Sequence, residues 1–177
     1  MPRIETERLV IRPFVPEDWP GMQALAINKE SSRGARYDHT WPTTEDECKG
    51  MAEYFAGGQY YAAVLKQNQR IIGLLAFNSI DANKQLDLGH VMHTEFQGND
   101  HDREALEAII DFAFRDQDIA SVITLNVAAP DWTEQIAPLK SLGLTPIAED
   151  KPGELAISRQ DWESRQRPEA PSRGLLW

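Results

Sequence analysis

Residues 86–127 read LDLGHVMHTEFQGNDHDREALEAIIDFAFRDQDIASVITLNV, and this stretch decides the fold. The segment LDLGHVMH alternates as a β-strand does, and SVITLNV is rich in the β-branched residues that strands favour. Between them, apolar side chains recur at helical spacing and predict a helix from 103 to about 115; they are Leu106, Ile109, Ile110 and Ala113. Strand, helix and strand in this order predict a βαβ crossover, which makes the two strands parallel neighbours.

The residues before this unit predict strands and two helices. Residues 8–14 predict a strand, and a helix is expected from Pro16, with a buried stripe of Trp19, Met22, Leu25 and Ala26. Residues 31–42 show no usable period and predict an ordered loop. Thr44 and Glu47 have the spacing of a capping box, and the helix that follows, with Cys48 in its core, should stop at Gly57. The segments QYYAAVLK and RIIGLLAFNSI then predict a buried hairpin.

The residues after the unit complete a mixed α+β protein. A helix is expected over 132–142, bent or shortened at Pro138 and ended at Gly143, and weak strands near 145–149 and 154–158 should follow. The whole order is strand, two helices, three strands, helix, strand, helix and two strands. No internal repeat is visible.

Composition narrows the class of protein. The chain has 177 residues and a mass of 20.0 kDa, the size of one domain, with 41% hydrophobic and 26% charged residues. No run is long enough to span a membrane and the N-terminus lacks a signal peptide, so a cytoplasmic protein is expected. The net charge of −10 argues against a nucleic-acid binder; it suits an amine-bearing partner, or reflects solubility alone. The single Cys48 offers neither a disulfide nor a zinc site, and no metal is expected.

Four segments together resemble the GCN5-related N-acetyltransferase (GNAT) family, in its RimJ/RimL-like branch. They are IETERLVIRPFVPEDW, LDLGHVMHTEFQG, SLGLTPIAE and LAISRQDWESR. The resemblance implies the GNAT fold, with a mixed sheet of about seven strands and about four helices. Residues 1–165 would form this domain and 166–177 a C-terminal tail, in a monomer or a homodimer. It also implies transfer of an acetyl group from acetyl-CoA to a primary amine, either a protein N-terminus or a small molecule.

The family's loop for the pyrophosphate of acetyl-CoA matches Gln97, Gly98, Asn99, Asp100, His101 and Asp102. In the family pattern, small residues let backbone N–H groups meet the phosphates at the head of the main helix. Here Asp100 stands at a glycine position and Asp102 at a glycine or alanine position. A carboxylate roughly 5 Å from a phosphate charge opposes it by about 3 kcal/mol at an effective dielectric of ~20. Asp102 is also an apt N-cap for a helix that starts at Arg103, whereas His101 and Arg103 offer compensating charge.

The resemblance also places the rest of a site. Main-chain groups of Val91, Met92 and His93 would meet the pantetheine, and Asp87 is the candidate general base or, alternatively, a solvated carboxylate. Trp132 and Gln135 stand where many relatives carry asparagine and serine, so the indole would either stack on the cofactor or block its groove. Tyr37, His39 and Trp41 would form an aromatic wall for the amine, or simply anchor their own loop.

Two functions from different classes therefore remain open. One is an N-acetyltransferase in which the amine attacks the thioester directly. The other is a GNAT-fold binding or regulatory protein that has lost acetyl-CoA binding, which Asp100, Asp102, Trp132 and Gln135 favour. Use of a different acyl donor is a third possibility.

Overall fold

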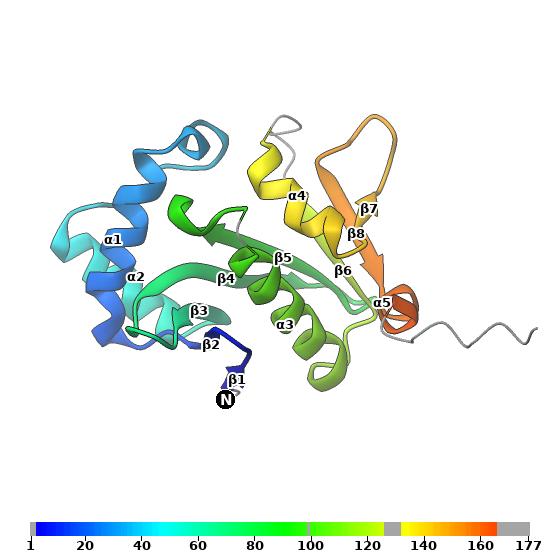
Figure 1. Ribbon diagram of the computed structural model, residues 1–177, viewed down its shortest axis with the longest axis horizontal. Coiled ribbons are helices and arrows are strands. Elements are labelled where there is room, and N and C mark those ends of the chain that lie inside the picture. Colours follow the sequence, from blue (N-terminus) through cyan, green and yellow to red (C-terminus); the bar gives the residue numbers. More distant parts are fainter. Residues whose placement is uncertain (1–2, 99, 126–131, 166–177) are drawn as a thin grey trace, which may run out of the picture.

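The computed structural model describes residues 3–98, 100–125 and 132–165, whose strands join in one mixed sheet (Figure 1). The order across the sheet is β1-β2-β3-β4-β5-β6-β8-β7. The strands are β1 (Ile4–Glu5), β2 (Leu9–Pro13), β3 (Tyr60–Leu65), β4 (Ile71–Ile80), β5 (Gln85–Met92), β6 (Ser121–Leu125), β7 (Thr145–Pro146) and β8 (Glu154–Ser158). The α-helices are α1 (Trp19–Glu30), α2 (Glu45–Ala56), α3 (His101–Asp116), α4 (Thr133–Ser141) and α5 (Arg159–Arg165). Short 3-10 helices are η1 (Pro16–Asp18), η2 (Arg33–Tyr37) and η3 (Thr94–Phe96).

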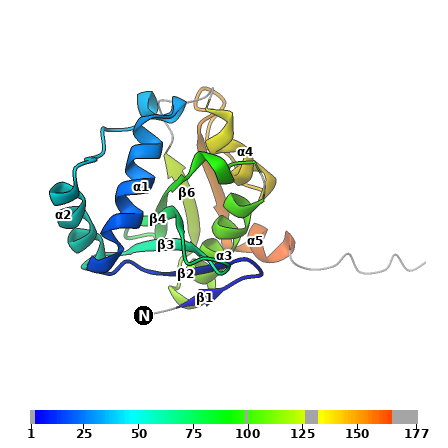
Figure 2. The same ribbon diagram turned by 60° about the vertical axis from the view of Figure 1, so that its left-hand side comes forward.

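Helices cover both faces of the sheet: α1 and α2 lie on one side, α3 and α4 on the other (Figures 1 and 2). Two cores result. Leu9 and Ile11 of β2 point into the core under α3, whereas Val10 between them points into the core under α1 and α2. Strands buried on both faces read as continuous apolar runs, which explains sequences such as IIGLLAF in β4.

The parallel pairing of β5 with β6 is short. It joins Gln85 to Ser121, Leu86 to Val122 and Asp87 to Ile123. Beyond these pairs β5 continues to Met92 beside β4, while the end of β6 pairs with β8 on its other side. In the described residues the two parallel strands therefore separate after Asp87, and this opening positions the candidate site.

Most predicted elements are confirmed. The hairpin of β3 and β4, the third strand β5 and the parallel crossover through α3 lie where the sequence placed them. Cys48 is completely buried, and burial raises the pKa of its thiol. Helix α4 contains Pro138 and ends before Gly143, whose φ of +91° is the left-handed conformation expected after a helix end.

The start of α1 differs from the prediction. Residues 16–18 form a 3-10 turn, and the α-helix begins at Trp19. Trp19 was expected in the buried stripe but is only half-buried, because its ring lies 5.0 Å from the ammonium of Lys49 at the surface. Lys29 takes the last buried position of the helix instead.

The predicted capping box at Thr44 and Glu47 is wrong. Helix α2 does begin after Thr44, but the threonine hydroxyl donates to Glu47 Oε2 at 2.5 Å rather than pairing with the backbone. The two exposed side chains bond to each other, so neither accepts a hydrogen bond from the backbone N–H groups at the start of the helix.

Within residues 3–98, 100–125 and 132–165 the sheet has eight strands and there are five α-helices, against about seven and four expected. The prediction missed β1 and α5, and it placed no helix in residues 31–42, where η2 lies. The expected strand near 145–149 is only β7. Each missed element is too short for a periodic signal: α5 buries one side chain, Trp162, whose Nε1 donates to Asp111 Oδ1 of α3 at 2.9 Å. None of the described helices combines the length and apolar character needed to cross a bilayer.

Candidate functional site

A cavity of about 600 Å³ lies where β5 leaves β6, and we name it the central cavity. Its walls come from the end of η2 and the segment after it, from α2, from strands β3 to β6, and from the residues that open α4. The side of the sheet covered by α1 and α2 forms its floor. The residues around it include Tyr37, His39, Trp41, Tyr54, Tyr60, Asp87, Val91 and Trp132.

A bulge in β4 positions Asp87 at this cavity. The register passes from Phe77 opposite Leu88 to Ser79 opposite Asp87, so Asn78 is the extra residue. Its Nδ2 donates to Asp87 Oδ2 at 3.4 Å. A Cβ at position 89 would lie 2.8 Å from the same nitrogen, so Gly89 is required for this arrangement.

Burial raises the pKa of the Asp87 carboxyl, and the hydrogen bond from Asn78 offsets part of this effect. A carboxylate with a raised pKa binds a proton more readily than an exposed one. A partly buried carboxylate of this kind suits a general base, and the role of Asp87 stays a prediction.

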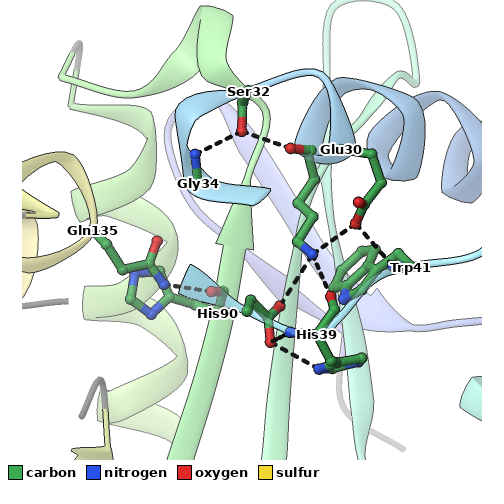
Figure 3. Close-up of polar contacts among 9 residues, drawn as sticks. Glu30, Ser32, Gly34, His39, Trp41, His90 and Gln135 are labelled. Atoms are coloured by element: carbon green, nitrogen blue, oxygen red, sulfur yellow. Dashed lines mark hydrogen bonds and ion pairs between the residues drawn. The ribbon is translucent and has the colours of Figure 1, made fainter. Parts of the chain in front are cut away.

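The open edge of β5 is occupied by two glutamine side chains. His93 N–H donates to Ile72 O of β4 at 2.8 Å, so the main-chain groups of the alternate residues turn toward the opening. There Gln135 Nε2 donates to His90 O at 2.6 Å (Figure 3), and Gln97 Nε2 donates to Met92 O at 3.2 Å. These carbonyls have partners within the chain, so a ligand in the opening would have to compete for them.

The His90 side chain is buried and neutral. Its exposed fraction is 7%, and burial lowers the pKa of the imidazole from 6.5 to about 4. Its Nε2 has no hydrogen-bond partner among the described residues. The described residues also hold no group of three or more His, Cys, Asp or Glu side chains that could bind a metal ion.

A buried lysine holds the loop that carries His39 and Trp41, two residues labelled in Figure 3. Lys29 is 3% exposed, and its Nζ donates to Glu30 Oε1 at 2.7 Å and to His39 O at 2.5 Å. It also lies 3.7 Å from Asp38 Oδ2 and 5.5 Å from the ring centroid of Trp41. The hydrogen bond from Lys29, and then that from the Trp41 N–H at 2.8 Å, lower the pKa of the Glu30 carboxyl. One ammonium thus orders the whole segment that carries the aromatic wall.

Trp132 joins this loop to α4. It is buried, and its ring stacks on Tyr37 with centroids 5.3 Å apart. A Cβ at Gly34 would lie 2.5 Å from the indole, so the 3-10 helix η2 presents a glycine at this point. The indole therefore packs against η2 and also lines the central cavity.

In the loop before α3, backbone N–H groups donate to a carboxylate of the same loop. Helix α3 begins at His101, two residues before the predicted start, because Asp100 rather than Asp102 is its N-cap. Asp100 has a φ of +69°, a conformation in which glycine is favoured. Asp102 is buried, and its carboxylate accepts hydrogen bonds from the N–H groups of Gly98 at 3.3 Å and Arg103 at 2.7 Å. The loop therefore does satisfy backbone donors with an aspartate, although not through the predicted N-cap.

A second cavity of about 430 Å³, the α3 cavity, lies between this loop and α4. Its ionisable lining residues are three acids and one base: Asp100, Asp102, Glu134 and Arg103. A pyrophosphate is negatively charged and needs backbone N–H groups or cations. The Gly98 N–H already has Asp102 as its acceptor, so in this arrangement the residues do not fit the pyrophosphate of acetyl-CoA.

The predicted site residues fall into two groups. Asp87, Val91, Trp132 and the three aromatic-wall residues line the central cavity. Gln97, Gly98, Asp100 and Asp102 line the α3 cavity. His101, at the start of α3, packs its ring 5.3 Å from that of Phe96. Asn99 lies outside the described residues.

Two of the expected main-chain contacts involve groups that already have partners within the chain. The expectation grouped Val91, Met92 and His93 as main-chain partners of the pantetheine. The His93 N–H is used in sheet pairing and the Met92 carbonyl is bound by Gln97, because alternate residues of a strand face opposite neighbours. His93 instead accepts the Glu95 N–H on its Nδ1 and contacts Arg70 through Nε2.

Sequence reasoning missed Asn78, Lys29 and Tyr54 as parts of the site. Asn78 acts through a bulge, which leaves no mark in the strand pattern. Lys29 looks like an ordinary helix-end lysine, and its burial depends on Asp38, nine residues away, as well as on Glu30. Tyr54 could have been found, because an aromatic side chain on the exposed face of a helix is an unusual choice.

The geometry defines a class of α+β protein in which a pair of parallel strands separates around a small-molecule site. The chain matches the model of the acetyltransferase (GNAT) domain over residues 8–131. It therefore belongs to the GNAT acetyltransferase family.

Individual relatives agree with this assignment. The chain is 23% identical over 143 residues to the uncharacterized N-acetyltransferase YnaD of Bacillus subtilis, covering 80% of this chain and 81% of that protein. The structure of a ribosomal-protein-S5-alanine acetyltransferase from Vibrio fischeri aligns with a TM-score of 0.77 and 17% identity, covering 95% and 100% of the two chains. RimL, a ribosomal L7/L12 α-N-protein acetyltransferase solved with coenzyme A, aligns with a TM-score of 0.71 and 17% identity, covering 89% and 98%. At this identity the two structures support the fold.

The buried His90 predicts an acid-sensitive stability. Its pKa is depressed in the folded state, so the unfolded state binds more protons and stability falls as the pH drops from 6.5 toward 4. The decrease in the free energy of unfolding attributable to His90 is on the order of 3 kcal/mol. The free energy of unfolding, measured with urea across this pH range, should depend less on pH for His90→Leu than for the parent. His39→Leu, whose ring is 80% exposed, is the control, and parallel profiles for parent and His90→Leu would contradict the assignment.

The acidic loop predicts a gain of binding on substitution. The double variant Asp100→Gly with Asp102→Ala should bind acetyl-CoA at least about tenfold more tightly than the parent, because it removes two charges and releases the Gly98 N–H. Isothermal titration calorimetry measures the change. Asp116→Asn, an exposed acid at the far end of α3, is the matched control. Unchanged or weaker binding by the double variant would refute the electrostatic account.

Proposed function

We propose that this chain transfers an acetyl group to a primary amine held in the central cavity. The observation that carries the proposal is the position of Asp87, at the last β5–β6 pair and on the wall of that cavity. Membership of an acetyltransferase family makes acetyl transfer the expected reaction. The aromatic wall and the acidic character of the chain suit an amine acceptor.

In this proposal Asp87 prepares the amine acceptor for attack on the thioester. Asp87 would bind the ammonium form of the amine, directly or through a water, and take its proton. The neutral amine then has the lone pair needed to attack an acetyl carbonyl, forming the C–N bond as the C–S bond of a thioester breaks. We assign no general acid among the described residues, so the leaving thiolate would take its proton from solvent.

Acetyl-CoA is the acetyl donor of the family, and the α3 loop as described does not fit its pyrophosphate. No step of the proposal is therefore assigned to the loop. The proposal concerns the acceptor side, where cavity, base and aromatic residues occur together.

A second candidate function is a binding protein that keeps the fold without the transfer. The contacts from Asp102 to the Gly98 N–H and from Gln135 to the His90 carbonyl favour it, because they occupy main-chain groups that a donor would use. The stacked and buried Trp132 favours it as well.

Mass spectrometry of product distinguishes the two. The full-length chain would be incubated with acetyl-CoA or with acetyl-pantetheine, and with amines or short peptides. An acetylated amine is the expected result. Absence of product with both donors across the acceptors would contradict acetyl transfer and leave the binding function.

Asp87→Asn should lower the acetylation rate about 10²–10³-fold, since a positioned general base contributes this much. The difference in rate between Asp87→Asn and the parent should become smaller above the pKa of the amine, because the acceptor is already neutral there. Glu163→Gln, an exposed change on α5, should keep the parent rate and serves as the control. An unchanged rate for Asp87→Asn at neutral pH would remove Asp87 from this role.

A further inference from the structure

We propose that the acceptor of this chain is a small amine with an aromatic body, recognised as a cation by Asp87 within the central cavity, rather than a protein N-terminus. The inference rests on the proposed function and names its substrate class. The charge, the walls and the hydrogen-bonding capacity of the cavity support it separately.

The charge of the cavity selects a cation. None of its described lining residues is a lysine or an arginine, and two are carboxylates, Asp38 and Asp87. Asp38 is already engaged, 3.7 Å from the buried ammonium of Lys29 and 2.8 Å from the His39 ring. Among the described residues, the Asp87 carboxylate accepts a long hydrogen bond from Asn78, at 3.4 Å. Asp87 is thus the carboxylate with capacity for an added ammonium.

The walls select an apolar body. On one side Phe55 and Tyr60 stack with centroids 4.4 Å apart, and Tyr54 joins them at 5.6 Å from Tyr60. On the other side Tyr37 stacks on Trp132 at 5.3 Å. Aromatic faces on two sides of a cavity attract both a ring and a positive charge.

The floor is small and apolar, which gives the cavity its depth. Ala76 and Gly89 contribute little side-chain volume, and Leu74 and Val91 continue the same surface. A cavity of about 600 Å³ is the size that proteins use for compact organic ligands.

A peptide would be poorly matched. Its main-chain amides need hydrogen-bonding partners when they leave water. The Gln135 side-chain amide already donates to the His90 carbonyl. This side-chain donor and this main-chain acceptor are therefore not available to a peptide. The Asn78 amide is directed at Asp87. A ligand with one ammonium and a hydrocarbon body makes fewer demands of this kind.

Binding of four probes tests the proposal by calorimetry on the full-length chain. They are 2-phenylethylamine, its neutral isostere 2-phenylethanol, putrescine as a cation without a ring, and hexapeptides that begin with Ala or Ser. We expect 2-phenylethylamine to bind at least tenfold more tightly than each of the others. Equal affinity for the alcohol, or tighter binding of a peptide, would overturn the proposal.

Variants locate the ligand. Tyr54 is 67% exposed, so Tyr54→Ala removes little buried surface and should weaken 2-phenylethylamine binding several-fold, while Tyr54→Phe should preserve it. Ile147→Ala, at an exposed position near β7, is the control and should bind as the parent does. Equal binding by Tyr54→Ala and the parent would contradict the location.

Transfer assays on the same probes separate this inference from the proposed function. Selective binding of 2-phenylethylamine without acetylation by either thioester would overturn acetyl transfer and leave the ligand class standing. Acetylation of the peptides in preference to 2-phenylethylamine would keep acetyl transfer and overturn the ligand class.

Discussion

The site depends on how early the parallel pairing of β5 with β6 ends. Three residue pairs hold the strands together, the last of them Asp87 with Ile123. Beyond this pair β5 remains bound to β4, and the end of β6 to β8, so the sheet keeps its hydrogen bonds while one seam opens. The opening creates the central cavity and places a carboxylate at its inner end. A longer parallel pairing would close the cavity and leave Asp87 within the ladder.

The two walls of the opening are tied together by interactions of different kinds. On the α1 side a buried ammonium, that of Lys29, holds the loop through Glu30 and the His39 carbonyl. Such an interaction is specific because the charge would be costly to bury without its partners. On the α4 side Trp132 reaches across to Tyr37 by aromatic stacking. The Tyr37–Trp132 stack therefore links the loop of the aromatic wall to the start of α4. A ligand that moves the indole would also disturb this loop.

The sequence predicted the parts of the molecule that local pattern controls. The crossover of β5, α3 and β6 follows from alternation and helical spacing, and the family resemblance led to Asp87 and the aromatic loop. The β4 bulge at Asn78 and the contact of Gln135 with His90 depend on tertiary distances that no local pattern encodes. The start of α3 was misplaced because Asp100 adopts a left-handed conformation that a sequence argument reserves for glycine. The pantetheine contacts stay a prediction, although the three consecutive residues cannot all turn their main-chain groups to one side, since neighbouring strand residues face opposite sides.

The donor and acceptor sides thus differ: the loop at the head of α3 satisfies itself with Asp102, whereas the central cavity presents a carboxylate and aromatic rings to a ligand. A crystal structure of the chain with 2-phenylethylamine tests this account most directly. The account predicts the ammonium nitrogen within about 3 Å of an Asp87 carboxylate oxygen, with the ring between the aromatic walls. An amine bound at the α3 cavity, or in the central cavity with its nitrogen turned away from Asp87, would contradict it.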